Sequence, residues 1–386
     1  MPVVVRPNSS ISTFDGAVVR KVIFPMLWIL VGFMTALIAT EGLLWAFPVA
    51  TGMPRTKHVH AWPMYNYRPK MPYTYSRGWD FQTPAAGVTN NFGQLSPFDY
   101  STDKPVVVVI GDSYVESKMN PFEYTLPAYL QRHMPDDVAV MGFGASGLSI
   151  ADYLVLLREL QSAFKVIGVV VVQIDGDISE SLERRLGWAR FSTEGGQLRL
   201  LPAVLPGDSD QSRIKRMLKR SALYRYLRSN LTFLLSDIFG VFHRQADAPV
   251  ETSANGTRHR DAVNAADYFL KSLHDELKME GQCVVFLSDP DRLRMYTGKA
   301  SHLIDAVQVR DAFRQRATEL GFRYVNLETA FRAFYANTGR RLDHSPFDRH
   351  WNRFGHAVAA AEAGAVLRRC PGVFASSGDR FVGVAQ

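Results

Sequence analysis

Ser113 is the residue of this sequence best placed to act as a nucleophile. It follows four valines and an isoleucine in VVVVIGDSYVES, residues 106–117. A serine at the turn between a buried strand and a helix projects its Oγ from the edge of the sheet. The Gly-Asp-Ser triplet is short enough to occur by chance. The prediction therefore depends on a base, an acid and oxyanion donors elsewhere in the chain.

The segment DRHWNRFGH, residues 348–356, offers the base and the acid. Asp348 and His350 are two positions apart, and side chains at this spacing face the same side of an extended segment. The Asp348 carboxylate can then hold Nδ1–H of the imidazole while Nε2 faces Ser113. Catalytic triads recur in several chain orders, so Ser, Asp, His is acceptable chemistry. We expect Ser113 as nucleophile, His350 as base and Asp348 as the acid that orients it.

Two backbone N–H groups are the expected oxyanion donors. One belongs to Ser113 itself. The other belongs to Gly144 in the loop GFGASG, residues 142–147, where the missing Cβ lets backbone approach a substrate. We therefore predict an oxyanion hole formed by Ser113 and Gly144.

Other polar residues near these motifs have simpler interpretations. Asp112 and Asn352 are expected to cap the helices that follow them, and His356 is expected to be structural. Trp351 can pack over its loop or provide a face for a sugar. The spacing of Asp348, His350 and His356 does not match compact metal sites, and the two cysteines form no CxxC motif. No metal and no cofactor are expected.

Alternating strand and helix signals after residue 104 predict an α/β domain over 105–372. Continuous β-branched runs favour strands buried on both faces, which is typical of a parallel sheet covered by helices. We expect a strand in each of 105–113, 137–147, 165–177, 283–290 and 322–331. We expect helices over 121–134, 149–164, 261–281, 301–321 and 355–368. Residues 178–260 form an insertion with a predicted basic amphipathic helix, and 373–386 form a tail.

Residues 22–49 are predicted to be a transmembrane anchor. Val22–Thr40 contains 19 residues without a charge, which is about the length that crosses a bilayer core. A cleaved signal peptide and a buried soluble helix are the alternatives; the apolar core is long for a signal. The basic N-terminus 1–21 is expected on the cytoplasmic side. This places a single-pass protein in the inner membrane with its domain in the periplasm or outside the cell.

The remaining composition is that of an ordinary globular protein. The net charge of +7 permits an acidic partner or a membrane surface, and no nucleic-acid-binding motif is present. Residues 50–104 are rich in Pro, Tyr, Gly and Asn and are expected to form an irregular lead-in. Whether Cys283 and Cys370 form a disulfide stays open at this point.

The motifs resemble those of the SGNH, or GDSL-type, hydrolase superfamily. The similar blocks are IGDSYVES, GFGASG and DRHWNRFGH, and TNNFG at residues 89–93 looks like a segment that precedes the first block in anchored members. The resemblance implies a flavodoxin-like three-layer sandwich and chemistry on esters, often acetyl groups on sugars. The D-x-H-W-N form is similar to the branch of membrane-tied alginate O-acetyltransferase-like proteins.

One block departs from the family pattern. The family uses an asparagine as an oxyanion donor after the third strand, whereas this chain has QIDGDISES, with Asp175 or Gly176 at that place. An aspartate there would repel an oxyanion. The candidate replacements, as oxyanion or substrate contacts, are Gly176, Asn90, Asn91 and Gln173.

The sequence therefore predicts a membrane-anchored serine esterase or O-acetyltransferase that forms an acyl-serine. The expected partners are an acylated cell-surface or exported polysaccharide, or another acyl ester, together with polysaccharide-biosynthesis proteins. Two alternatives stay open. One is a non-catalytic glycan-binding or assembly component of a polysaccharide export system. The other is a lipid-acting esterase, suggested by the basic segment around 213–230.

Overall fold

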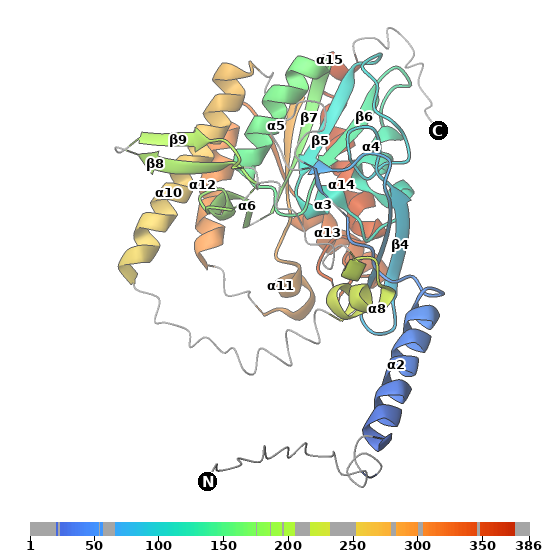
Figure 1. The fold of residues 1–386 in the computed structure, drawn as a ribbon. Coiled ribbons are helices and arrows are strands. Elements are labelled where there is room, and N and C mark those ends of the chain that lie inside the picture. The colour runs from blue at the N-terminus through green and yellow to red at the C-terminus, as the bar shows by residue number, and fades with distance from the viewer. Residues whose placement is uncertain are drawn as a thin grey trace, which may run out of the picture.

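The computed structural model contains a central parallel sheet of five strands (Figure 1). It describes residues 21, 24–53, 55–56, 66–174, 176–185, 187–194, 197–204, 217–231, 252–278, 283–299, 304–345 and 348–374. The strands are β5 (Val106–Gly111), β6 (Ala139–Gly144), β7 (Val166–Gln173), β10 (Val284–Ser288) and β11 (Arg323–Asn326). Their order across the sheet is β11-β10-β7-β5-β6, and every pair is parallel. Numbered along the chain this is 2-1-3-4-5, the flavodoxin-like order.

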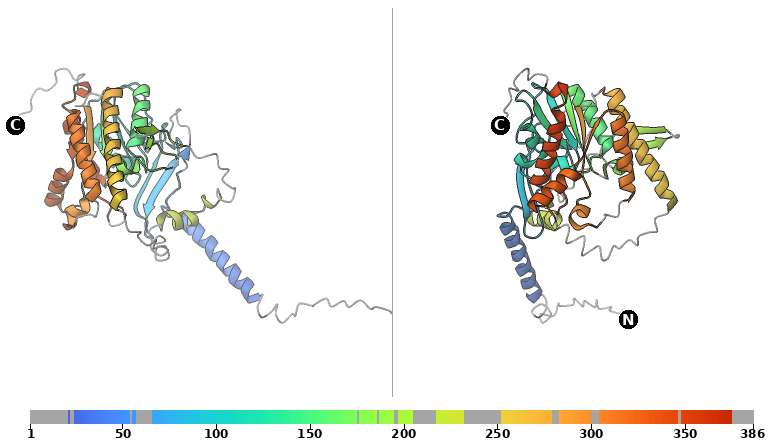
Figure 2. Two further views of the ribbon diagram at one scale, coloured as in Figure 1. Left: turned by 90° about the vertical axis from the view of Figure 1, so that its left-hand side faces the viewer. Right: turned by 180° about the vertical axis from the view of Figure 1, so that it is seen from behind.

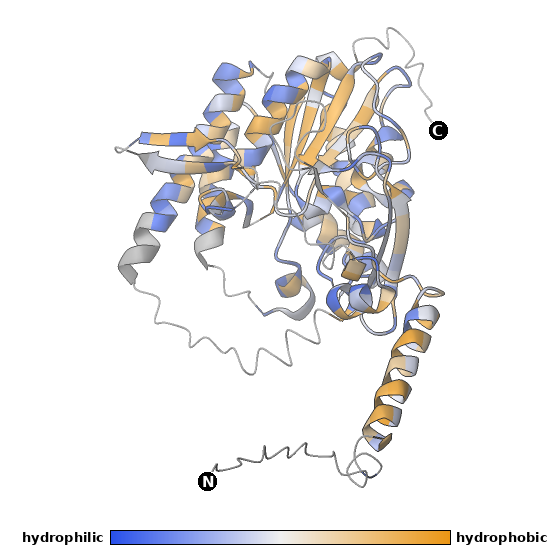
Figure 3. Cartoon of the chain, viewed as in Figure 1, coloured by the Kyte–Doolittle hydropathy of each residue, from blue (hydrophilic) through white to orange (hydrophobic). Residues whose placement is uncertain are grey.

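Helices cover both faces of the sheet, so the expected three-layer α/β architecture is confirmed (Figure 2). One face carries α5 (Ile150–Ala163), α10 (Thr252–Lys271) and α12 (Ile304–Glu319); the other carries α4 (Leu126–Gln131), α13 (Glu328–Thr338) and α14 (Arg353–Leu367). Alternate residues of β5 divide between the two cores. Val106 and Val108 pack toward the α5 side, and Val107 and Val109 pack toward α14. Double-sided burial explains the continuous apolar strands, which are orange in Figure 3.

The smaller elements lie mostly at the ends of the sheet strands. They are α3 (Ser113–Glu116), the 3₁₀ turn Phe122–Tyr124, α6 (Gly176–Glu180), α11 (Arg292–Thr297) and α15 (Pro371–Phe374). The fifth strand is shorter than the sequence predicts. It ends at Asn326, because α13 begins at Glu328 and uses the apolar residues that follow to cover the sheet.

The lead-in contains regular structure that the sequence analysis did not anticipate. It forms the strand pair β1 (Arg55–Thr56) and β2 (Asn66–Tyr67) and the hairpin β3 (Pro72–Arg77) and β4 (Gln82–Val88). In β3 the alternating Tyr73 and Tyr75 are both buried. Alternation over only two tyrosines is a weak signal in a Pro-rich segment, which is why the hairpin was not predicted.

The insertion also differs from a single basic helix. Its described part contains the hairpin β8 (Arg190–Glu194) and β9 (Gln197–Leu201). The short helix α8 (Ala222–Arg225) comes next and continues into one π-helical turn, Tyr226–Asn230. The rest of the predicted basic helix, 213–216 and 232–240, lies outside the described residues.

Helix α2 (Phe24–Leu44) projects from the domain (Figure 1). It is long and apolar enough to cross a membrane, and only 6% of its most apolar window is buried. Most of its length is coloured as hydrophobic in Figure 3. Glu41 lies in its last turn. A core helix of a soluble domain would be mostly covered, so this exposed apolar helix is consistent with either a signal anchor or a signal peptide.

A disulfide joins Cys283 to Cys370, with the two Cα atoms 5.1 Å apart. It ties the start of β10 to the end of α14, on the core face that α14 covers. Both cysteines of the chain are used. Disulfides of this kind persist in oxidising compartments, which agrees with a domain outside the cytoplasm.

Replacing both Cys283 and Cys370 by alanine is expected to lower the free energy of unfolding. The disulfide closes a loop of 87 residues, and loop entropy for such a length corresponds to about 4.6 kcal/mol. Urea unfolding of the oxidised protein and the double variant measures the difference. Equal stability would contradict a structural role for this disulfide.

Candidate active site

Ser113 begins α3 directly beyond the carboxyl end of β5 (Figure 1). Asp112 caps this helix, because its Oδ1 accepts a hydrogen bond from the Tyr114 N–H at 2.9 Å. The site lies between β5 and its neighbours β6 and β7, where the strand order reverses. Ligands of open parallel sheets bind at this point.

The structure brings Ser113, His350 and Asp348 together. The Ser113 Oγ lies 2.6 Å from His350 Nε2. On the other side of the ring, His350 Nδ1 is hydrogen-bonded to Asp348 Oδ1. The backbone N–H of His350 also donates to this oxygen, at 2.9 Å. This arrangement fixes the ring so that Nε2 can accept the serine proton.

Asp348 has a further partner that the sequence did not suggest. The Tyr75 hydroxyl, from β3 of the lead-in, donates to Asp348 Oδ2 at 2.5 Å, and Arg77 Nε donates to the same hydroxyl at 3.1 Å. Burial works against ionisation of Asp348, but the hydrogen bonds from His350 and Tyr75 outweigh it and hold its pKa well below the usual range. The carboxylate is therefore charged near neutral pH.

The loop that carries His350 is held in place through the residues on either side of this histidine, Arg349 and Trp351. The Tyr114 hydroxyl donates to the Arg349 carbonyl at 3.2 Å, and its ring lies 4.9 Å from the His350 ring. Trp351 is fully buried, and its Nε1 donates to Asp289 at 2.7 Å. Trp351 therefore packs in the core instead of offering a face to a sugar.

A buried arginine completes this brace. Arg292 binds Asp289 at 2.9 Å and Asp343 at 3.2 Å, and it donates to the Tyr114 hydroxyl at 2.5 Å. The ion pairs join the loop after β10 to the loop before α14. A buried arginine with all these partners keeps the two loops in one relative position.

Two of the predicted oxyanion contacts are already engaged. The Gly144 N–H donates to Gln94 Oε1 at 3.0 Å. The Asn91 amide pairs with the backbone of Tyr100, with both hydrogen bonds at 2.9 Å. A substrate oxyanion can use the single Gly144 N–H only if its bond to Gln94 breaks. The sequence analysis missed Gln94 because a contact across 50 residues leaves no local signal.

The remaining candidates for oxyanion or substrate contacts differ in whether they offer a hydrogen-bond donor or an acceptor. Asn90 is buried, and its Nδ2, a donor, has no hydrogen-bond partner among the described residues; its Oδ1 accepts from the backbone N–H groups of Phe92 and Gln94. Gln173 is also buried, but its unpartnered atom is Oε1, an acceptor that would repel an oxyanion. Gly176 opens α6 beyond the end of β7. Asp175 lies outside the described residues.

A second group of acids lies beside the nucleophile. Asp112 Oδ2 is 3.1 Å from Ser113 Oγ, and burial raises the pKa of Asp112. Burial, together with the Asp112 charge, also raises the pKa of Asp177 well above its usual range. Asp177 accepts hydrogen bonds from Tyr153 and from the Ile174 N–H. A neutral Asp177 would not repel negative charge near α6. Asp175, the aspartate at the place of the family's asparagine, lies outside the described residues.

His356 has a structural position. Its Nδ1 accepts from the Leu126 N–H at 3.1 Å, so Nε2 carries the proton and donates to Ser117 Oγ at 2.9 Å. Burial lowers the pKa of His356 to about 3. Asn352 caps α14, as predicted. Within the described residues, no group of three His, Cys, Asp or Glu side chains lies together as a metal site.

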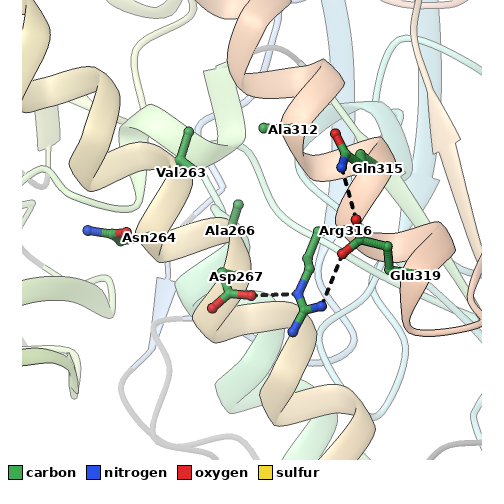
Figure 4. Close-up of a pocket in the computed structure, with 8 residues that line it drawn as sticks. All are labelled: Val263, Asn264, Ala266, Asp267, Ala312, Gln315, Arg316 and Glu319. Carbon is green, nitrogen blue, oxygen red and sulfur yellow. Dashed lines mark hydrogen bonds and ion pairs between the residues drawn. The ribbon is translucent and has the colours of Figure 1, made fainter.

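A surface pocket lies between α10 and α12, apart from the groups just described (Figure 4). Arg316 in this pocket already binds Asp267 and Glu319. Its lining includes none of the residues around Ser113. The pocket therefore adds nothing to the candidate active site.

Comparisons with known proteins find similarity at the level of folds only. No family model and no curated protein matches the sequence. A lipolytic protein of the G-D-S-L family from Veillonella parvula is 11% identical; the match covers 68% of this chain and 98% of that one, with a TM-score of 0.34. The lipase/acylhydrolase from Enterococcus faecalis is 10% identical (68% and 95% covered, TM-score 0.35). The acetyl xylan esterase AlAXEase is 12% identical (68% and 99% covered, TM-score 0.36). These TM-scores are low, and it is the strand order and the contacts of Ser113 that define this chain's fold and site.

Tyr75→Phe is expected to lower kcat for ester cleavage about ten-fold with little change in KM, because a hydrogen bond to a charged group contributes about 1.5–3 kcal/mol. Tyr100→Phe is the control, because the Tyr100 hydroxyl bonds to the Gly142 backbone. Equal activity in the two variants would contradict the role of Tyr75.

His356→Gln is expected to reduce the acid sensitivity of the fold. The folded-state pKa of His356, about 3, lies below its usual value of 6.5. The unfolded chain therefore binds the extra proton first, and stability is full above pH 6.5 and falls as the pH drops toward 3. Between pH 6 and 4.5 this group accounts for about 2 kcal/mol. Glutamine can keep both hydrogen bonds without titrating.

Urea unfolding at both pH values measures the effect, and His133→Gln, at an exposed position, is the matched control. If His356→Gln and the parent lose the same stability over this interval, His356 is not buried in its neutral form.

Proposed function

We propose that this chain is a serine-dependent acyl-ester enzyme, an esterase or an O-acetyltransferase. The observation that carries the proposal is the contact of 2.6 Å between Ser113 Oγ and His350 Nε2, with Asp348 on the opposite ring nitrogen. A nucleophile bonded to a base that is itself oriented by an acid is the arrangement that activates a serine.

The reaction then follows from the positions of the atoms. Ser113 Oγ attacks the ester carbonyl carbon while His350 Nε2 takes its proton. The tetrahedral intermediate collapses when His350 returns this proton to the leaving alcohol, and an acyl-serine remains. Water or a sugar hydroxyl next attacks the acyl-serine, with His350 again as base, and Ser113 is regenerated. Asp348 stabilises the imidazolium in both steps.

For the oxyanion we propose the Ser113 N–H and the Asn90 amide as donors. Asn90 Nδ2 is the free donor among the described side-chain candidates. The Gly144 N–H remains a candidate only if Gln94 moves when substrate binds. Gly176 offers a backbone N–H, while Gln173 and Asn91 fit substrate contacts better than oxyanion contacts. Loss of one such donor typically lowers kcat about 10²–10³-fold.

The proposed location is the inner membrane, with the domain in the periplasm or outside the cell. Helix α2 supports this proposal because its last turn is part of the folded structure. Glu41 accepts hydrogen bonds from Ser221, Ala222 and Leu223, each at 2.8 Å. A signal peptide that is cleaved makes no such permanent contacts. The disulfide supports an oxidising compartment.

The proposed substrates are acetyl or other acyl esters of a cell-surface or exported polysaccharide. The resemblance to anchored alginate O-acetyltransferase-like proteins favours transfer to a sugar, and polysaccharide-biosynthesis proteins are the proposed partners. A two-domain esterase active on acetylated mannans is among the similar folds, at 8% identity and a TM-score of 0.36. The function as proposed does not depend on this similarity.

Ser113→Ala is expected to reduce hydrolysis of an activated acetyl ester at least about 10³-fold, because the triad loses its nucleophile. A serine-directed phosphonate should label the parent once, at Ser113. Ser117→Ala is the matched control, because Ser117 lies in the same segment but bonds to His356. It should keep the label. Absence of an adduct in the parent, together with measurable glycan binding, would favour a non-catalytic glycan-binding protein.

A further inference from the structure

The segment 217–231 clasps the membrane-proximal end of α2. Besides the three hydrogen bonds to Glu41, it buries Ala222 against Leu44 and Val49. Arg225 places its guanidinium 5.1 Å from the centre of the Trp45 ring. Residues 180 positions apart are thus joined in one small core. The orientation of α2 relative to the domain is therefore fixed by specific contacts.

The same segment also braces the strand that supports the triad. Asn230 accepts from the Ala50 N–H at 3.1 Å and donates to Ser76 Oγ at 2.6 Å. Its carbonyl accepts from the Gly78 N–H at 3.0 Å. Ser76 neighbours Tyr75, the donor to Asp348. A continuous set of contacts therefore runs from the end of α2 through Asn230 and β3 to the active site.

Large apolar side chains are exposed around this junction. We call the following residues the collar: Trp45, Phe47, Trp79, Met217, Leu218 and Leu227. Trp79 is 69% exposed and Met217 is 72% exposed. The Trp79 carbonyl accepts a hydrogen bond from the Tyr226 hydroxyl at 3.0 Å, so the turn between β3 and β4 lies beside the clasping segment 217–231. Aromatic and aliphatic side chains exposed beside an apolar helix are typical of the interface of a bilayer.

The charge of the clasping segment matches an anionic surface. Residues 217–231 contain Lys219, Arg220, Arg225 and Arg228 and no aspartate or glutamate. Lysine and arginine near a membrane surface each contribute about 1 kcal/mol of attraction to anionic lipids. Apolar and basic residues occur together here, which distinguishes this region from an ordinary solvated surface.

The active-site edge of the sheet lies toward the same side. In Figures 1 and 2, α8 and α11 lie on the side of the domain from which α2 extends. Helix α11 follows the carboxyl end of β10, and Ser113 follows the carboxyl end of the parallel strand β5. The carboxyl ends of parallel strands share one edge of a sheet. The Ser113 edge is therefore the membrane-proximal edge.

We propose that the collar rests in an anionic phospholipid surface and holds the Ser113 edge toward it, so that the enzyme acts on esters presented at the bilayer. This inference rests on the proposed membrane anchor and adds the contact surface and the direction from which substrate arrives. The collar side chains lie in the lipid headgroup region.

Site-directed spin labelling of the full chain in nanodiscs with about one third phosphatidylglycerol, an anionic lipid that attracts basic segments, tests the collar. Both native cysteines are in the disulfide, so one introduced cysteine gives one label. The positions are Leu218→Cys and Trp79→Cys in the collar, Ile29→Cys in α2 and Ala163→Cys at the exposed end of α5. We expect oxygen to relax the collar and Ile29 labels more than a water-soluble nickel chelate does, and the reverse at Ala163.

The outcomes separate the collar from the anchor. If Ile29 is in lipid but both collar labels behave like Ala163, the collar proposal is wrong and the anchor stands. If Ile29 is also exposed to water, the proposed anchor itself fails. Phosphatidylcholine alone should weaken the Leu218 signal and leave Ile29 unchanged. An unchanged Leu218 signal would overturn the part assigned to the basic residues.

Discussion

The candidate active site depends on a buried carboxylate that must remain charged. Asp348 is 5% exposed, and burial alone would favour its neutral form. Two donors from His350 and one from Tyr75 supply the stabilisation that water would otherwise give. The cost of an unpaired buried charge is several kcal/mol, so the geometry of these donors is constrained. That constraint links the His350 loop to a hairpin 273 residues away in the sequence.

Other buried polar contacts also hold the loops around Ser113 and His350 in position. Trp351 and Arg292 share Asp289, and Arg292 reaches the hydroxyl of Tyr114 beside the nucleophile. These bonds join the loops after β5 and β10 to the loop before α14 at one edge of the sheet. Together the bonded loops keep Ser113 and His350 within hydrogen-bond distance.

The sequence could predict the sheet and the grouping of Asp348 and His350 with Ser113, because both leave local signals. Buried parallel strands are continuous apolar runs, and Asp348 and His350 are two positions apart. The contacts between distant segments could not be predicted in this way. Tyr75 lies in a segment with little periodicity. The Gln94 side chain accepts the hydrogen bond of the Gly144 N–H, and no sequence pattern indicates that this side chain points there. The start of α13 was missed because Val325 and Leu327 extend the strand pattern up to the helix.

The disulfide shows the same limit, since two cysteines alone do not reveal whether their Cα atoms are close. The lead-in shows that sequence reasoning can also miss residues of the candidate site. A Pro-rich segment that looked irregular carries Tyr75, contacts the clasping segment 217–231 and lies between the apolar helix α2 and the candidate site. Its role comes from packing over long sequence separations, which is where single-sequence reasoning is weakest.

Every step of the proposed reaction requires Ser113 to carry the acyl group. Rapid acid quenching of the parent protein mixed with an activated acetyl ester, followed by peptide mass spectrometry, detects this intermediate. We predict one acetyl group on the peptide that contains Ser113, formed within the first turnover and lost as the acyl-enzyme is consumed. Ester cleavage that proceeds with no acetylated Ser113 at any time, or with the acetyl group on another side chain, would contradict the proposed mechanism.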